Sequence, residues 1–209
     1  MVRTIIFDFD GTIADTLDSV VRIVNSNADH FGYKTVTKED IPYLQGKKPR
    51  EILSYLGISL SKLPLWIKKI HVEINKEILD MKPTRNIMPL LSELHKDTSN
   101  NLGILTSNTK ENVRQFLSKN ELDFFDFIHA GKSVFGKSYM INKIIKQNPT
   151  QKNNIFYVCD EIRDIEAAKK SSIQSIAVTW GYNTKDALKK ENPNFIVENI
   201  DELRSILIP

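Results

Sequence analysis

Two carboxylates, two residues apart, form the most informative motif of the chain. The motif Asp8-Phe9-Asp10-Gly11-Thr12 directly follows a short apolar run at residues 2–7. Turns are rich in Asp and Gly, so an isolated motif of this kind can be a simple turn. Here the pair ends a run that we expect to be a buried strand, where unpaired carboxylates are costly unless a cation neutralises them. The motif therefore indicates a site for a cation.

Two later clusters supply groups that suit an anion. Thr106-Ser107-Asn108 ends a second apolar run, and the same residue types also begin helices as N-caps. A hydroxyl and backbone N–H groups at a helix N-terminus form an anion site. Lys137 begins a predicted helix with an apolar face, and Lys132, which also follows a glycine, is the alternative. Single lysines are most often solvated surface residues, so this assignment depends on the other clusters.

A second group of acids follows a later apolar run, which ends at Cys159. Asp160 and Asp164 are four residues apart and would share one face of a helix that began near Glu161. Acids are also common in the first turn of helices, where their negative charge interacts favourably with the helix dipole. That explanation accounts for Glu161 and Asp164 better than for Asp160, which is joined directly to the apolar run.

Together these clusters predict phosphoryl-transfer chemistry. The acids form the oxygen-rich site that a hard cation such as Mg²⁺ prefers. The ammonium, hydroxyl and N–H groups suit a phosphate, and positioning with charge neutralisation dominates phosphoryl transfer.

The elements that must position these groups alternate along the chain. Short, largely uncharged runs predict strands at 2–7, 102–106, 127–130, 155–159 and 175–179, and helical patterns lie at 89–96, 110–119, 138–146 and 162–170. This alternation predicts an α/β fold with a doubly wound parallel sheet. Right-handed crossovers would place the carboxyl ends of the strands at one edge, where ligands bind.

One segment breaks the alternation, because residues 16–81 show only helical periodicity. We expect an inserted all-helical cap at 16–81 and an α/β core at 1–15 and 82–209. Pro83 disfavours a helical conformation at Lys82, which fits a returning linker there.

The composition predicts a single core of ordinary size with a companion subdomain. The 209 residues are 41% hydrophobic and carry a net charge of +3, which implies neither a nucleic-acid nor a membrane partner. No run approaches the roughly 20 apolar residues that span a bilayer. One cysteine, Cys159, permits no intrachain disulfide, and we expect a soluble cytoplasmic protein. No pattern indicates the oligomeric state.

At these clusters the chain resembles the haloacid dehalogenase-like hydrolase superfamily, over its whole length. Residues 157–168 (YVCDEIRDIEAA) and 178–182 (VTWGY) are similar to its phosphoglycolate-phosphatase-like branch. The resemblance implies a Rossmann-like core, a helical cap and a phosphatase that acts on a small phosphorylated metabolite.

The resemblance also implies roles for individual residues. Asp8 would be the nucleophile that forms an aspartyl-phosphate, and Asp10 would protonate the leaving oxygen and later activate water. Thr106 and Lys137 would hold the phosphoryl group. The remaining implied contacts are phosphate binding by Gly11, Ser107 and Asn108, and Mg²⁺ binding by Asp8, the Asp10 carbonyl and Asp160, with Asp164 nearby or acting through water.

Two positions depart from the family pattern. Cys159 stands where glycine is usual, which would strain the backbone if φ were positive there. Otherwise Cys159 is a small buried hydrophobic residue, the interpretation that we favour. Ser138 stands where proline often follows the lysine. Neither departure removes a group that the chemistry needs.

The cap sequence offers one candidate for substrate specificity, the basic loop around Gly46. Lys47 and Arg50 of this loop could reach a second anionic group, such as the carboxylate of phosphoglycolate, with Arg50 the better forked donor. A solvated helix start explains the same bases equally well.

Other functions remain as alternatives. A sugar phosphomutase shares all four clusters and the cap, and sequence spacing does not separate it from a phosphatase. A non-catalytic regulatory module is a second alternative. Loss of Asp8, Asp10, Lys137 or Asp160 would have favoured it, and all four are present. Asp10 argues against a dehalogenase, which needs no acid to protonate a halide. The absence of G-x-G-x-x-G after the first run argues against a dinucleotide-binding enzyme.

Overall fold

The computed structural model of the chain describes residues 2–130, 136–147 and 151–208. Its strands are β1 (Arg3–Phe7), β2 (Ala14–Asp15), β3 (Lys82–Pro83), β4 (Asn100–Thr106), β5 (Phe127–Ala130), β6 (Ile155–Cys159), β7 (Gln174–Val178) and β8 (Phe195–Val197). Its helices are α1 (Leu17–Ser26), α2 (Ala28–Phe31), α3 (Ile41–Leu44), α4 (Pro49–Leu56), α5 (Leu63–Glu77), α6 (Ile87–Lys96), α7 (Lys110–Lys119), α8 (Lys137–Gln147), α9 (Ile162–Ser171), α10 (Lys185–Lys190) and α11 (Ile200–Leu207), with a 3₁₀ turn at Lys152–Asn154.

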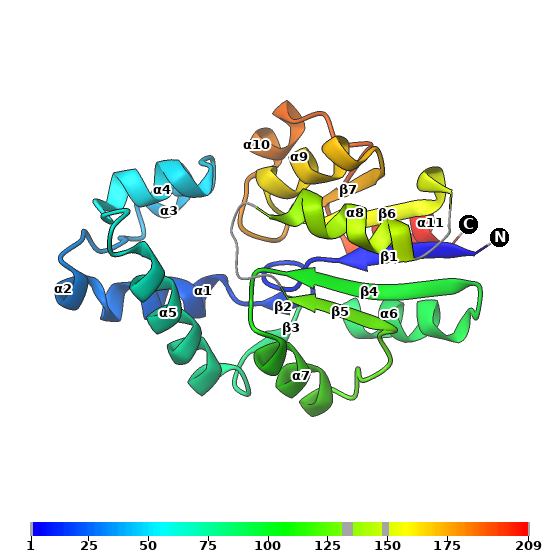
Figure 1. Cartoon of the computed structure of the whole chain (residues 1–209), viewed down its shortest axis with the longest axis horizontal. Helices are drawn as coiled ribbons and strands as arrows, with labels where there is room; N and C mark the ends of the chain where they lie inside the picture. The colour runs from blue at the N-terminus through cyan, green and yellow to red at the C-terminus, as the bar shows by residue number, and fades with distance from the viewer. Residues whose placement is uncertain (1, 131–135, 148–150, 209) are drawn as a thin grey trace.

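Six strands form one parallel sheet in the order β5-β4-β1-β6-β7-β8, which confirms the predicted doubly wound α/β fold (Figure 1). The five expected strands are present with small differences in their ends. Strand β4 begins at Asn100, before its apolar run, because Asn100 and Asn101 pair with Arg3 and Thr4 of β1. Strand β8 was not predicted, since it has only three residues and follows a polar segment.

The expected helices are also present. Helix α6 begins at Ile87, two residues before the predicted start at Pro89. A proline within the first turn removes no intrahelical hydrogen bond, because the N–H groups of that turn have no partner within the helix.

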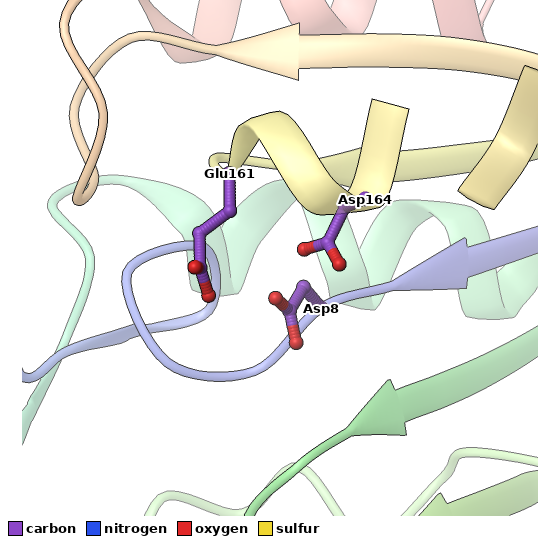
Figure 2. A group of neighbouring side chains, drawn as sticks. All are labelled: Asp8, Glu161 and Asp164. Atoms are coloured by element: carbon purple, nitrogen blue, oxygen red, sulfur yellow. The ribbon is translucent and has the colours of Figure 1, made fainter. Parts of the chain in front are cut away.

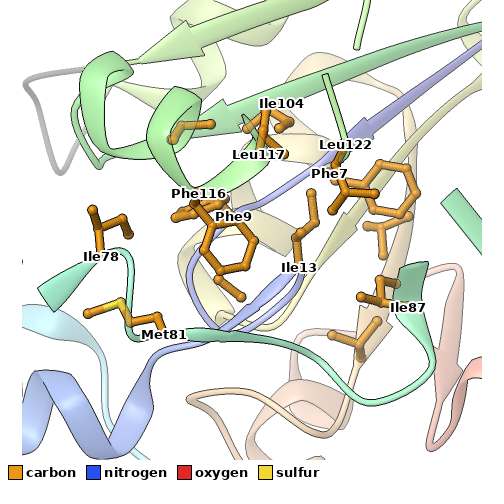
Figure 3. Close-up of a cluster of buried hydrophobic side chains, with 14 of the residues drawn as sticks. Phe7, Phe9, Ile13, Ile78, Met81, Ile87, Ile104, Phe116, Leu117 and Leu122 are labelled. Carbon is orange, nitrogen blue, oxygen red and sulfur yellow. The ribbon is translucent and has the colours of Figure 1, made fainter. Parts of the chain in front are cut away.

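Alternate residues of β1 enter two buried layers, one on each face of the sheet. Ile5 and Phe7 belong to the cluster that contains the apolar faces of α6, α7 and α11, whereas Ile6 packs with those of α8, α9 and α10. The first layer continues past the strand to Phe9, whose ring meets that of Phe116 edge to face at 5.1 Å (Figure 3). The buried rings of Phe7 and Phe9 therefore anchor the chain on either side of Asp8.

Helices α1 to α5 gather beside the sheet, on the left of Figure 1. The chain leaves the sheet region through β2 and returns through β3, and these strands pair antiparallel, Ala14 with Pro83 and Asp15 with Lys82. The division into a core at 1–15 and 82–209 and a cap at 16–81 remains a prediction. Within the described ranges no helix is long and apolar enough to cross a membrane.

Candidate active site

The carboxyl edge of the sheet brings the acidic motif together with groups from other strands. Asp8 directly follows β1, and its backbone N–H donates to the carbonyl of Val158 in the neighbouring β6 at 2.8 Å. This bond continues the ladder one residue beyond β1, so the Asp8 side chain emerges from a fixed backbone. The residue is only 3% exposed.

Lys137, the first residue of α8, joins two acids of this edge. Its Nζ atom lies 2.8 Å from Oδ2 of Asp8 and 2.8 Å from Oδ1 of Asp164. All three side chains are buried. The structure thus brings three residues that the sequence singled out into one ion-pair network. Lys132, the alternative to Lys137, lies outside the described residues.

Glu161 completes the acidic group, and the sequence reasoning assigned it no role. Carboxylate oxygens of Asp8, Glu161 and Asp164 all lie within 4.8 Å of one another, and their side chains face each other in Figure 2. Glu161 is the N-cap of α9 with an extended backbone, which directs it to the strand edge. Its position directly after Asp160 is the only signal in the sequence, and the same position is typical of an acid at a helix start.

The charges of this network shift one another. Burial favours the neutral form of Asp8, but the Lys137 ammonium outweighs burial and holds the pKa of Asp8 below its usual range. For Asp164, burial and the charge of Asp8 outweigh Lys137 and raise the pKa. Burial lowers the pKa of Lys137, but the charges of Asp164 and Asp8 together have the larger effect and raise the pKa above its usual value. This lysine is therefore charged.

The same acids fit a divalent metal ion. Asp164 Oδ1 is buried and accepts no hydrogen bond, although the Lys137 ammonium lies beside it. Three clustered carboxylates repel one another, and a hard cation with oxygen ligands would relieve that repulsion. Asp8, Glu161 and Asp164 are therefore among the residues that would hold Mg²⁺ here.

Asp160 has a different environment from the other acids. Its Oδ1 accepts from the Thr12 hydroxyl at 2.8 Å, and its Oδ2 accepts from the Tyr182 N–H at 2.7 Å. Burial, followed by the charge of Asp8, raises its pKa. Helix α9 begins at Ile162 with Glu161 as its N-cap, so Asp160 lies just before the helix and Asp164 lies in its first turn. Its role in metal binding remains a prediction.

Two glycines enclose the Asp160 carboxylate. A Cβ atom at Gly11 or at Gly181 would lie 2.3 Å from Asp160 Oδ2, and Gly11 also has φ +76°. Both positions therefore require glycine for close packing. The structure gives Gly11 this packing function, and its predicted phosphate contact is not tested.

Asp10 lines the cleft, and its pKa is shifted in the direction opposite to that of Asp8. The side-chain amide of Asn108 donates to both Asp10 oxygens, at 3.2 and 3.1 Å. Burial and the nearby charge of Asp8 raise the pKa of Asp10 to about 7, against the opposing effect of Asn108. The structure thus places a carboxyl group that can hold a proton near neutral pH two residues from one that is ionised.

The predicted anion-binding segment ends β4 at the same edge. Thr106 is buried, and its Oγ1 accepts from the Asn108 N–H at 2.9 Å, which orients the hydroxyl hydrogen away from that N–H. Ser107 and Asn108 line the cleft beside Asp10. Thr109 caps α7 by accepting from the Asn112 N–H, so these residues lie at a helix N-terminus as expected.

A cleft of about 260 Å³ lies between this edge and the helices of 16–81. From the sheet side it is lined by Asp10, Ser107, Asn108, Glu161, Arg163 and Tyr182. The opposite wall is mostly apolar, with Trp66 and Ile70 of α5, and includes His71. Burial lowers the pKa of His71, which favours its neutral form. No sequence motif includes His71, so the sequence does not predict its place in the cleft.

The two basic residues of the cap loop lie away from this cleft. Lys47 borders an adjoining cavity of about 190 Å³, with its Nζ 3.5 Å from Glu51 and 4.8 Å from the Tyr43 ring centre. Arg50 is exposed and borders neither cavity. Their predicted role in substrate specificity is not tested by this arrangement.

Cys159 is the last residue of β6 and is fully buried among apolar side chains. It has no positive φ, so the backbone is unstrained, and the interpretation of Cys159 as a small hydrophobic residue is confirmed. Burial raises the pKa of its thiol, which keeps it uncharged beside the acids.

The chain is similar to known proteins over most of its length. The sequence model of the haloacid dehalogenase-like hydrolase family matches residues 5–178. A phosphoglycolate phosphatase of Synechococcus elongatus is 32% identical over 97% of this chain and 95% of its own length. A pyrophosphatase PpaX of Anoxybacillus flavithermus is 23% identical over 99% of this chain and 97% of its own. A haloacid dehalogenase-like hydrolase of Streptococcus pneumoniae has the same fold, with a TM-score of 0.82 at 20% identity over 98% of both chains.

Proposed function

Since the chain belongs to the haloacid dehalogenase-like hydrolase family and its named relatives are phosphatases, we propose that it hydrolyses a small phosphomonoester with Mg²⁺ through a covalent intermediate on Asp8. One observation carries the proposal: the environments of two carboxylates of one motif shift their pKa values in opposite directions. Asp8 is held ionised, whereas the pKa of Asp10 is raised to about 7. Environments that separate two pKa values in this way assign a nucleophile and an acid.

In the first step, a carboxylate oxygen of Asp8 attacks the phosphorus of the ester. The bond from phosphorus to the ester oxygen breaks, and that oxygen takes the electron pair and a proton from Asp10. Lys137, now paired with Asp8, would hold a phosphoryl oxygen, and Thr106 would donate its hydroxyl hydrogen to another. Bound Mg²⁺ would supply charge neutralisation that lets a phosphate dianion approach the acids.

In the second step, Asp10 acts as a base. Its carboxylate takes a proton from a water molecule while the water oxygen attacks phosphorus, and Asp8 leaves as a free carboxylate. Asn108 holds both Asp10 oxygens in the structure, which supports the same orientation in both steps. We assign Mg²⁺ to Asp8, the Asp10 carbonyl, Asp160 and Asp164, and add Glu161 because its carboxylate faces Asp8 and Asp164.

The proposal takes phosphoglycolate as the first substrate to test, because the relative of Synechococcus elongatus has that name. Residues 16–81 would be the cap that encloses the substrate, with Lys47 and Arg50 as candidate contacts to its second anionic group. Gly11, Ser107 and Asn108 would add phosphate contacts. We also propose a cytoplasmic location, supported by the free and buried Cys159.

The test is phosphate release from a panel of phosphomonoesters and inorganic pyrophosphate, with Mg²⁺ and with a chelator. Mg²⁺-dependent release from a monoester supports the proposal, and trapping of a phosphorylated Asp8 identifies the intermediate. Release from pyrophosphate alone would reassign the substrate. Transfer of the phosphoryl group to a sugar rather than to water would make the protein a mutase.

A further inference from the structure

A line of three asparagine amides leads from the cap helices to Asp10. Asn75 of α5 donates through Nδ2 to Oδ1 of Asn112 at 2.6 Å. Asn112 of α7 donates to Oδ1 of Asn108 at 2.8 Å, and Asn108 donates to both oxygens of Asp10. Each of the three amides donates from its nitrogen towards Asp10, and the oxygens of Asn112 and Asn108 accept from the preceding amide. Hydrogen bonds arranged head to tail in this way polarise one another.

The central amide of this line, Asn112, is buried, and burial of an amide costs free energy unless its hydrogen bonds are made. Asn112 is 0% exposed on a helix whose other buried residues are apolar. Asparagine is a weak helix former, and a buried amide must have hydrogen-bond partners. Its partners here are two other amides, one from the cap and one in the cleft.

The orientation of Asn108 depends on Asn112. The Asn108 oxygen accepts from the Asn112 side chain and from the Thr109 N–H, both at 2.8 Å. These two donors fix which end of the Asn108 amide faces Asp10, because only the NH₂ end can donate to its oxygens. Loss of Asn112 would leave one donor to hold the amide.

We propose that Asn112 is a positioning residue that orients Asp10 through Asn108, and that Asn75 extends this control to the cap. The inference rests on the proposed function of Asp10. Asn112 touches no reacting atom, and it sets the direction from which Asp10 delivers its proton. The chain of amides crosses from α5 to α7, so the cap contributes to the placement of the acid.

The test uses the dependence of the rate on the leaving group. p-Nitrophenol leaves as a stable anion and needs little help from an acid, whereas an alkyl alcohol must be protonated as it leaves. Asn112→Ala should therefore lower kcat for an alkyl phosphate such as phosphoglycolate roughly tenfold more than for p-nitrophenyl phosphate, as part of the 10²–10⁴ that an acid supplies. KM for both esters should stay close to that of the unaltered protein. Asn75→Ala should act in the same direction and less strongly.

Matched variants separate positioning from general loss of structure. Asn27 is also buried, with its amide bonded to the Ile23 carbonyl, and Asn27→Ala should leave the ratio of the two rates unchanged. Lys76→Ala is the control beside Asn75 on α5. If Asn112→Ala slows both esters equally, as a structural defect would, the inference is overturned. If the unaltered protein hydrolyses neither ester, the proposed function itself falls, and the inference with it.

Discussion

The Nζ atom of Lys137 lies 2.8 Å from Oδ2 of Asp8, in a pair whose side chains are 7% and 4% exposed. The same ammonium neutralises Asp164. Removing one partner from a buried ion pair leaves the other charge uncompensated.

Lys137→Ala should lower the free energy of unfolding by about 3–5 kcal/mol. Urea unfolding in the presence of a chelator measures this loss. Mg²⁺ should restore part of it, because a cation then again faces Asp8 and Asp164. Lys185→Ala removes an exposed ion pair with Glu198 and serves as the control, with little expected effect. Equal stability of the two variants would contradict the interpretation.

Asp8→Asn should reduce turnover roughly 10³-fold or more, since the proposed mechanism forms the covalent intermediate on the Asp8 carboxylate. The protein should remain folded, because removing this charge relieves repulsion among the acids while Lys137 keeps Asp164 as its partner. Phosphate release and thermal unfolding check the two expectations. Retained turnover would show that Asp8 is not the nucleophile.

The rate should depend on pH through Asp10. Its pKa is raised to about 7, so the carboxyl is protonated below that pH and loses its proton above it. Formation of the Asp8 intermediate from an alkyl phosphate should therefore slow as pH rises through about 7. Rapid-quench measurement of the first turnover isolates this step from hydrolysis of the intermediate. In Asp10→Asn the slope should disappear, with a rate lower by roughly 10²–10⁴.

Mg²⁺ should stabilise the fold, by a free energy that grows with the logarithm of its concentration above Kd. A concentration one hundred times Kd gives about 2.7 kcal/mol, seen as a higher Tm than with a chelator. Glu161→Gln should reduce this gain if Glu161 is a ligand. Glu198→Gln, on an exposed acid, should leave the gain unchanged. An unchanged gain in Glu161→Gln would remove Glu161 from the proposed metal site.

Gly181→Ala should destabilise the protein by about 1–3 kcal/mol, because the new Cβ would lie 2.3 Å from Asp160 Oδ2. Displacement of Asp160 should also weaken Mg²⁺-dependent turnover. Gly46→Ala is the control, since its Cβ would meet the Tyr43 carbonyl at an ordinary 3.4 Å. Denaturant unfolding of both variants decides the comparison.

The sequence predicted the sheet and the residues at its carboxyl edge because both follow from local patterns. Apolar runs locate β1 and β6, and Asp8 and Asp160 follow directly from where these runs end. Strand β8 escaped prediction because its pairing with β7, rather than its own residues, makes it a strand.

Relations between distant residues could not be read in the same way. Glu161 has the pattern of a helix-start acid, and only the fold brings it to face Asp8. Asn75 and Asn112 are ordinary helix residues in the sequence, 37 positions apart, and meet because α5 packs beside α7. Periodicity predicts which face of a helix is buried, but it does not predict which side chain lies across from it.

The pairing of β2 with β3 has a mechanical consequence. Both covalent connections to helices α1 to α5 run through this one hydrogen-bonded ribbon, with Ala14 beside Pro83. Two paired chain segments resist being stretched or shifted along one another, but they can bend together as a two-stranded hinge. We therefore expect a rotation of α1 to α5 about this ribbon to widen the cleft and to separate Asn75 from Asn112, with the strands of the main sheet still paired.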